Sequence, residues 1–197
     1  MPEYRLRTPL SEEDVRKLRV GDIVYLSGII YTARDAAHKR ILEYLKEGKT
    51  LPFDLKDGAI FHCGPVAIKR DDKWAIVAAG PTTSTRMEMY EYDVIEKLGV
   101  RMIIGKGGMG SRTAEACKKY GAVYVTFTGG AGVLAAQSIK RVLEVYWLDL
   151  GIPEAVWVFE VEDFGPLVVA IDSTGRNLTE EVVREAIARK ERLLSKT

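Results

Sequence analysis

Four times along this chain of 197 residues, an apolar strand-like run ends in a loop of small or hydroxyl-bearing residues, and a helical pattern then begins. Alternation of this kind is typical of an α/β domain, in which such loops gather at the carboxyl ends of the strands. Because a helix start offers free N–H groups and partial positive charge, we expect an anion to bind at this edge. The loops lie at 27–35, 80–86, 105–111 and 126–132.

Apolar periodicity sets the expected elements. Strands are predicted over 22–26, 59–62, 74–79, 101–104, 123–127, 156–161 and 167–171, and helices over 35–47, 87–98, 113–120, 133–148 and 179–194. Strands between 57 and 79 follow one another without a helix, which indicates a β-rich elaboration. No linker divides the chain, so we predict one domain over residues 1–197, an α/β fold with a mixed sheet and flanking helices.

The charge balance argues against two large classes of partner. The chain has 29 basic and 28 acidic side chains, a formal net charge of +1, whereas nucleic acids and anionic membranes attract clustered positive charge. No apolar run has the length of a bilayer span, and residues 1–10 lack the apolar stretch of a secretory signal. We therefore expect a cytoplasmic protein that binds neither nucleic acid nor membrane.

Side chains that bind metals are few. Cys63 and Cys117 are the two cysteines, which cannot fill a four-thiolate site, and a reducing compartment disfavours a disulfide between them. His38 and His62 are the two histidines, and they lack the company of other zinc ligands. We predict that this chain itself holds no metal, that both thiols are ordinary packing groups, and that His38 is a surface or packing residue.

Three of the four loops carry a fixed cation: Arg34, Arg86 or Lys106. Such groups suit a carboxylate or a phosphate, so their convergence would form a site for a small anion. The alternative for Arg34 is a surface ion pair with Asp35, which stabilises little. Thr32 and Asp35 also have the spacing of a capping pair for the next helix.

The loop at 80–86 is rich in hydroxyl groups. Thr85 and Glu88 have the spacing of a capping box, which would put Arg86 at the first helical position. Three further hydroxyl residues exceed what capping needs, and we expect them to face outward as ligand contacts: Thr82, Thr83 and Ser84. The alternative is a hydroxyl-rich cap beside a solvated arginine.

The loop at 105–110 matches the G-x-G-x-x-G string between a strand and a helix. A dinucleotide site also needs an acidic residue about twenty positions after the loop, and 126–130 contains none. Lys106 inside the string suits a carboxylate or phosphate as a point charge. The remaining alternative is a structural glycine-rich turn.

Several of these segments resemble one known family. Gly-Pro-Thr-Thr-Ser-Thr-Arg-Met at 80–87 and Gly-Lys-Gly-Gly-Met-Gly at 105–110 are similar to motifs of the class I fumarate hydratases, and further similar segments lie at 28–38, 129–137 and 155–164. The likeness is to their C-terminal domain, which in two-subunit members is a separate β subunit. The L-tartrate dehydratase β subunit is a close relative.

The resemblance implies a fold and a set of partners. The fold would be a swivelling β/β/α domain. An oxygen-sensitive [4Fe–4S] cluster would be held by cysteines of a partner α subunit, which agrees with the scarcity of cysteine here. A small dicarboxylate would bind between the two chains, in a hetero-oligomer of αβ pairs.

The resemblance also implies roles for individual residues. Thr82 would be the catalytic base, with Thr83 beside it in contact with the substrate. Carboxylate-binding partners would be Arg34, Arg86 and Lys106, the last also catalytic. A threonine hydroxyl is a poor base unaided, and Asp35 is a local candidate for activating it.

Three functions remain open from the sequence. The main expectation is the β subunit of a hydro-lyase that hydrates fumarate to L-malate, with tartrate dehydration to oxaloacetate as the alternative substrate pair. A non-catalytic anion-binding module, suggested by the helix starts alone, is the second. A nicotinamide-dependent enzyme, suggested by 105–110, is the third.

Overall fold

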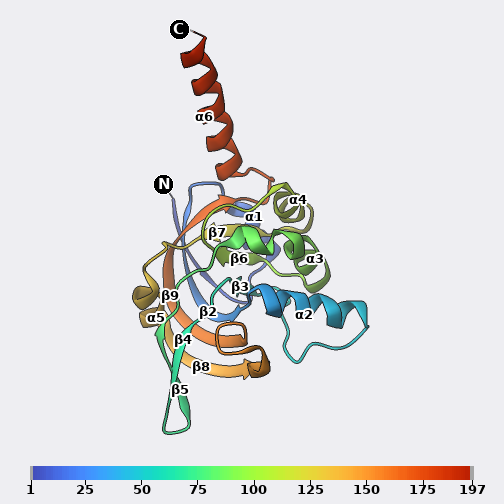
Figure 1. Ribbon diagram of the computed structural model, residues 1–197, viewed down its shortest axis with the longest axis vertical. Coiled ribbons are helices and arrows are strands. Elements are labelled where there is room, and N and C mark those ends of the chain that lie inside the picture. The colour runs from blue at the N-terminus through green and yellow to red at the C-terminus, as the bar shows by residue number, and fades with distance from the viewer. Residues whose placement is uncertain (1, 196–197) are drawn as a thin grey trace.

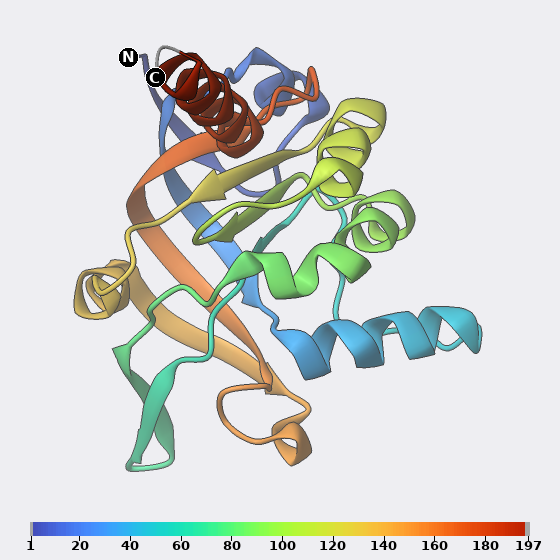
Figure 2. The ribbon, with the colours of Figure 1, turned by 45° about the horizontal axis from the view of Figure 1, so that its top comes forward.

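The computed structural model describes residues 2–195 and has a curved, mixed sheet flanked by helices (Figures 1 and 2). Its strands are β1 (Glu3–Arg7), β2 (Ile23–Thr32), β3 (Ala59–Phe61), β4 (Val66–Arg70), β5 (Lys73–Ala78), β6 (Met102–Gly105), β7 (Val123–Thr126), β8 (Ile139–Tyr146) and β9 (Val156–Ile171). Its α-helices are α1 (Glu12–Lys17), α2 (Asp35–Lys46), α3 (Glu88–Leu98), α4 (Ser111–Tyr120), α5 (Gly132–Ser138) and α6 (Leu178–Leu194). Short 3₁₀ turns are η1 (Ser84–Met87) and η2 (Leu148–Leu150). The expected α/β class with a mixed sheet and flanking helices is confirmed.

The main sheet has the strand order β1-β2-β3-β6-β7-β9-β8. The first five of these strands run parallel to one another, whereas β9 is antiparallel to β7, β8 and also β2. Because β9 pairs with β2 as well as β7, the sheet curls back on itself, as the long orange strand of Figure 2 shows. The parallel strands therefore all end at one edge, and the loops after them lie side by side.

Apolar side chains fill both faces of this sheet. One cluster lies inside the curl and includes Phe61, Trp157 and Phe164. The other lies between the sheet and helices α2, α3 and α4, where Ile41 and Val94 are fully buried. These three helices stack along one face in Figure 2. The predicted apolar stripes are thus the buried faces of the helices.

The helix predicted over 133–148 is wrong in its second half. Only α5 is helical there, and the chain continues directly as strand β8, which pairs antiparallel with β9. Ile139, Val142 and Tyr146 satisfy a helical spacing, but the segment is also rich in β-branched residues that pack well on a pleated surface. The segment fits both a helical and a strand pattern, and pairing with the long strand β9 selects the strand.

Two strands are longer than the sequence predicts. β2 continues through most of the loop expected at 27–35, which leaves residues 33–34 before α2. The strands predicted at 156–161 and 167–171 are one element, β9. The register between β2 and β9 shifts near Leu26, so bulges carry the ladder across positions that break the alternating pattern.

Strands β4 and β5 form a separate antiparallel hairpin that projects from the body (Figure 1). They confirm the β-rich elaboration expected between 57 and 79. Cys63 and Pro81 form an isolated bridge at the base of the hairpin, and the Thr82 N–H donates to the His62 carbonyl at 2.6 Å. The chain therefore returns to the end of β3, and the 80–86 loop lies at the carboxyl edge of the sheet.

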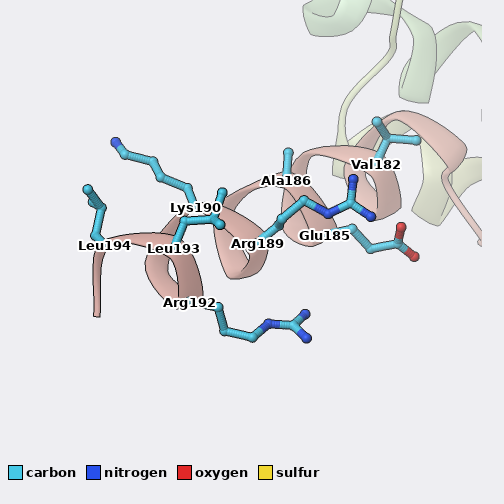
Figure 3. Close-up of a pocket in the computed structure, with 8 residues that line it drawn as sticks. All are labelled: Val182, Glu185, Ala186, Arg189, Lys190, Arg192, Leu193 and Leu194. Carbon is cyan, nitrogen blue, oxygen red and sulfur yellow. The ribbon is translucent and has the colours of Figure 1, made fainter. Parts of the chain in front are cut away.

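Helix α6 stands away from the body in Figure 1. Asn177 caps its start by accepting from the N–H groups of Thr179 and Glu180, and none of its described residues is buried. A shallow groove runs along it (Figure 3), lined by Val182, Glu185, Ala186, Arg189, Lys190, Arg192, Leu193 and Leu194. Within residues 2–195, no helix is both long and apolar enough to cross a membrane.

Candidate functional site

The residues expected to bind an anion lie on three neighbouring loops of one sheet edge. Arg34 and Asp35 stand where β2 passes into α2, and Arg86 lies in η1. Lys106 follows β6 directly and forms a parallel bridge with Thr83. The loops that carry Thr83 and Lys106, two residues 23 positions apart in the sequence, are thus joined by a direct contact.

Both arginines are already paired with carboxylates. Arg86 donates to Asp35 at 2.6 Å, and Arg34 Nε lies 3.2 Å from a Glu154 oxygen. Gly64 makes room for the Arg34 side chain, because a Cβ there would lie 2.5 Å from the guanidinium Nη1. In place of the alternative Arg34–Asp35 pair, the structure has two pairs between different segments, which tie α2 to η1 and to the turn before β9.

Two of the four helix starts are occupied by side chains of the protein itself. Glu154 accepts from the Ala36 N–H at the start of α2, at 2.9 Å. Glu88 accepts from the Gly110 N–H at 2.6 Å and from Thr113 at the start of α4. The expectation that every helix start is open to an anion is wrong here, because these carboxylates already bind the free N–H groups.

Neither predicted cap forms. Thr85 donates to the Gly108 carbonyl at 2.7 Å instead of capping α3, while Glu88 reaches across to α4. Thr32 donates to the Ala155 carbonyl and accepts from Trp157 N. These hydroxyl groups join neighbouring segments, since the capping spacing alone does not decide which backbone group they meet.

A fully buried polar cluster lies directly beneath these loops. Ser84 Oγ is 2.9 Å from His62 Nδ1, and His62 Nε2 is 2.6 Å from Glu91 Oε1. His38 Nε2 lies 2.9 Å from the same carboxylate oxygen. All four side chains are buried. His38 is therefore a packing residue with a charged partner, and Ser84 points inward although it was expected to face outward.

The electrostatics of the cluster favour one charged and one neutral histidine. Burial opposes the charge on His38, but the Glu91 carboxylate outweighs it and raises the pKa of His38. Burial dominates at His62 and lowers its pKa despite the same carboxylate. Burial would raise the pKa of Glu91, yet the two imidazoles lower it to about 2. These directions favour an ionised Glu91 beside a protonated His38.

These three side chains form the one group of potential metal ligands among residues 2–195. The sequence did not foresee it, because His38 lies on α2, His62 directly after β3, and Glu91 on α3. Each imidazole Nε2 lies close to the same carboxylate oxygen, Glu91 Oε1, at 2.9 Å for His38 and 2.6 Å for His62. His62 is hydrogen-bonded to that oxygen, whereas His38 Nε2 lies at ion-pair distance from it, and Glu91 Oε2 has no hydrogen-bond partner among the described residues.

The two cysteines do not fit an iron–sulfur cluster. Cys63 and Cys117 are both free and fully buried. Burial raises the pKa of each thiol, whereas cluster iron is held by thiolates. Among residues 2–195, the side chains offer no ligand set for a [4Fe–4S] group.

Glu91 and Glu154 were not foreseen from the sequence, and Ser84 was expected to face outward rather than toward His62. A readable signal existed for Glu91, which stands one helical turn before Val94 and Ile95 on the buried stripe of α3. A carboxylate at such a position needs a buried partner. Glu154 and Ser84 gave no comparable signal, because their partners come from distant segments.

The fold and these contacts define a class: a mixed α/β domain whose cations and hydroxyl groups meet at one sheet edge, above a buried ion pair. The chain belongs to the family described as Fumarase C-terminus, whose model matches residues 2–182.

Relatives of known name agree with this family. The chain is 49% identical over 176 residues to the L(+)-tartrate dehydratase subunit beta of Escherichia coli K12, covering 89% of this chain and 86% of that subunit. It is 52% identical over 174 residues, 88% of this chain and 89% of the relative, to a provisionally named L(+)-tartrate dehydratase subunit beta of Methanocaldococcus jannaschii. A provisionally named class I fumarate hydratase of Geobacillus stearothermophilus is 44% identical over 92% of this chain but 34% of its own length.

Proposed function

We propose that this chain is the β subunit of a two-subunit hydro-lyase that removes water from L(+)-tartrate. The supporting observation is the gathering of Arg34, Arg86 and Lys106 at one sheet edge beside Thr82. Relatives that match this chain over most of their own length are named tartrate dehydratase β subunits. This favours tartrate over fumarate, the substrate expected first from the sequence.

Fumarate is the second candidate substrate. It is supported by the similarity to a class I fumarate hydratase, although this chain corresponds to about a third of that longer protein. Fumarate, malate and tartrate all carry two carboxylates on a four-carbon chain, so the same cations suit each of them. A tartrate site must also accommodate a second hydroxyl group.

The proposed roles follow from the chemistry of the reaction. Removing water beside a carboxylate requires loss of a proton from the neighbouring carbon, and negative charge then builds on the carboxylate. Arg34, Arg86 and Lys106 would bind the substrate carboxylates and stabilise that charge. Thr82 would take part in the proton transfer.

The remaining two predicted residues would support the others. We assign Thr83 a hydrogen bond to the substrate. Asp35 has its carboxylate on Arg86, 2.6 Å from the guanidinium, so we assign it the orientation of that side chain in addition to its suggested influence on Thr82. The resident ion pairs would have to open or share their cations when a dicarboxylate binds, because both arginines now face protein carboxylates.

The proposal requires a partner. A β subunit by name implies an α subunit, and the iron–sulfur cluster implied by the family would lie on that chain, since the cysteines here do not fit it. The swivelling β/β/α fold type and the assembly of αβ pairs are parts of the same proposal.

The test is reconstitution. We expect the chain, co-produced without oxygen with an α subunit of the same family, to convert L(+)-tartrate to oxaloacetate faster than it hydrates fumarate. Thr82→Ala should abolish turnover, while Thr50→Ala, a change on an exposed loop, should not. Faster fumarate hydration would reverse the substrate order, and full activity of Thr82→Ala would remove Thr82 from the mechanism.

Binding measurements on the isolated chain test the two other functions that the sequence left open. A non-catalytic anion module would bind phosphate tightly without a partner, and calorimetry on the isolated chain measures this. Its original support has weakened, because protein carboxylates occupy the starts of α2 and α4. A nicotinamide enzyme would bind NAD at 105–110, where Glu88 already takes the Gly110 N–H.

A further inference from the structure

A continuous chain of contacts runs beneath the proposed site. The Lys106 N–H donates to Ser84 Oγ at 3.2 Å, and the Ser84 hydroxyl lies 2.9 Å from His62 Nδ1. His62 Nε2 meets Glu91 Oε1 at 2.6 Å. A carboxylate accepts only, so His62 donates through Nε2. Its Nδ1 therefore accepts from Ser84 in the neutral ring.

The far end of the chain fixes the second histidine. His38 Nδ1 lies 2.8 Å from the Arg34 carbonyl oxygen, which also accepts only, so Nδ1 carries a proton. His38 Nε2 faces Glu91 Oε1 at 2.9 Å, and an unprotonated nitrogen would repel that anion. Both ring nitrogens of His38 are therefore protonated, and the ring is a cation buried against Glu91.

We infer that Ser84, His62, Glu91 and His38 form a positioning network that holds the backbone of three substrate-binding loops in register. The inference rests on the proposed function. The network meets the Arg34 carbonyl through His38 and the Lys106 N–H through Ser84. It meets the Thr82 N–H through the carbonyl of His62. Each loop that carries a proposed binding residue is thus bonded to the same buried unit.

The buried position of the network raises the question of why its residues are polar rather than apolar. A buried ion pair gains little stability over apolar residues of the same size, because desolvation offsets the attraction. Apolar residues, however, could not bond to the Arg34 carbonyl and the Lys106 N–H, whereas the His38 and Ser84 side chains do. Gly105 adds to the constraint, since a Cβ there would lie 1.8 Å from Ser84 Oγ. The end of β6, directly before Lys106, thus has no room for a side chain beside that hydroxyl group.

The protonation pattern can be tested without any partner or activity. The chain has two histidines, so ¹⁵N-histidine NMR of the purified chain, with any tag removed, observes two rings. We expect one imidazolium and one neutral ring protonated at Nε2 at pH 7. Two neutral rings would overturn the network as drawn. Stoichiometric metal in elemental analysis, with ring nitrogens shifted on chelation, would also overturn it and make the cluster a metal site.

The positioning role is tested in the reconstituted enzyme. We expect Ser84→Ala and Glu91→Gln to lower kcat/KM for the preferred substrate at least tenfold. The matched control is Asp172→Asn, another buried carboxylate, which bonds to Val20 and Thr174 away from these loops. It should lose comparable thermal stability but stay within twofold of wild-type kcat/KM.

The outcomes separate the two proposals. Activity within twofold of wild type in both network variants would refute the positioning role. If Glu91→Gln does not fold, Ser84→Ala and the NMR of the wild-type chain still decide. If the wild-type pair turns over no dicarboxylate, the proposed function fails, while the NMR spectrum still reports whether the buried ion pair exists.

Discussion

The carboxyl edge of the sheet and helix α6 differ in which side chains they bury. Ionisable side chains are buried beneath the edge, whereas apolar side chains are exposed on α6. Beneath the edge, the ionisable side chains of Glu91 and His38 are fully buried. On α6, Val183 and Ile187 are 53% and 52% exposed. The family match covers 2–182 and so leaves most of α6 outside. The part of the chain that the family model matches thus contains these buried polar groups, whereas α6 has no buried residue among those described.

The largest expected effect breaks the buried pair. Glu91→Ala leaves a buried His38 without its counter-charge, and removing one partner of a buried ion pair costs about 3–5 kcal/mol. Urea unfolding followed by circular dichroism measures the change. Glu185→Ala on α6 is the matched surface control, expected to stay within about 0.5 kcal/mol. Equal losses in the two variants would erase the contrast.

A smaller loss is expected from crowding the network. Gly105→Ala puts a Cβ 1.8 Å from Ser84 Oγ, and overpacking of this kind costs about 1–3 kcal/mol. Adding Ser84→Ala removes the clashing atom, so the double variant should recover part of the loss. A double-mutant cycle of unfolding free energies measures the coupling. Additive losses would show that the clash lies elsewhere.

Acid should reduce the advantage of the buried carboxylate. The pKa of Glu91 is lowered to about 2 in the folded chain from an ordinary value of 4.5. Its contribution is therefore present above pH 4.5 and is lost as the pH falls through about 2. The difference in unfolding free energy between wild type and Glu91→Gln should shrink between pH 4.5 and pH 2. A constant difference would contradict the depressed pKa.

The smallest effect is expected from shortening α6. Truncation after Glu181 keeps the Asn177 cap and the Arg176–Glu181 pair and removes a stretch with no buried residue. The unfolding free energy should change by less than about 0.5 kcal/mol. Thermal and urea unfolding of the truncated chain measure it. A loss of several kcal/mol would mean that α6 packs against the body in solution.

Elements with one clear period were predictable, and those decided by distant pairing were not. Helix α2 and strand β6 lie close to their predicted bounds, because their apolar patterns admit one interpretation. Residues 139–146 fit two periods, and only the neighbouring strand β9 selects the extended form. The continuity of β9 depends on β-bulges in its pairing with β2, and the alternation of apolar and polar residues does not predict these bulges.

The candidate site divides in the same way. Loop chemistry was sufficient to single out Arg34, Arg86 and Lys106, since cations beside small residues stand out in a sequence. Their partners could not be read, because Glu154 lies 120 positions after Arg34 in the numbering and meets it only through the fold. A carboxylate that bonds to the first N–H groups of a helix elsewhere in the sequence cannot be predicted from residue spacing.

The hairpin of β4 and β5 has a consequence for how this chain can vary. Its two ends meet at the Cys63–Pro81 bridge, so its length is decoupled from the geometry of Thr82. Residues can be added or removed at its tip, near Asp71 and Asp72, while the anchoring bridge stays closed. Homologous chains can therefore differ in the length of this hairpin without a change in the position of Thr82 at the carboxyl edge of the sheet.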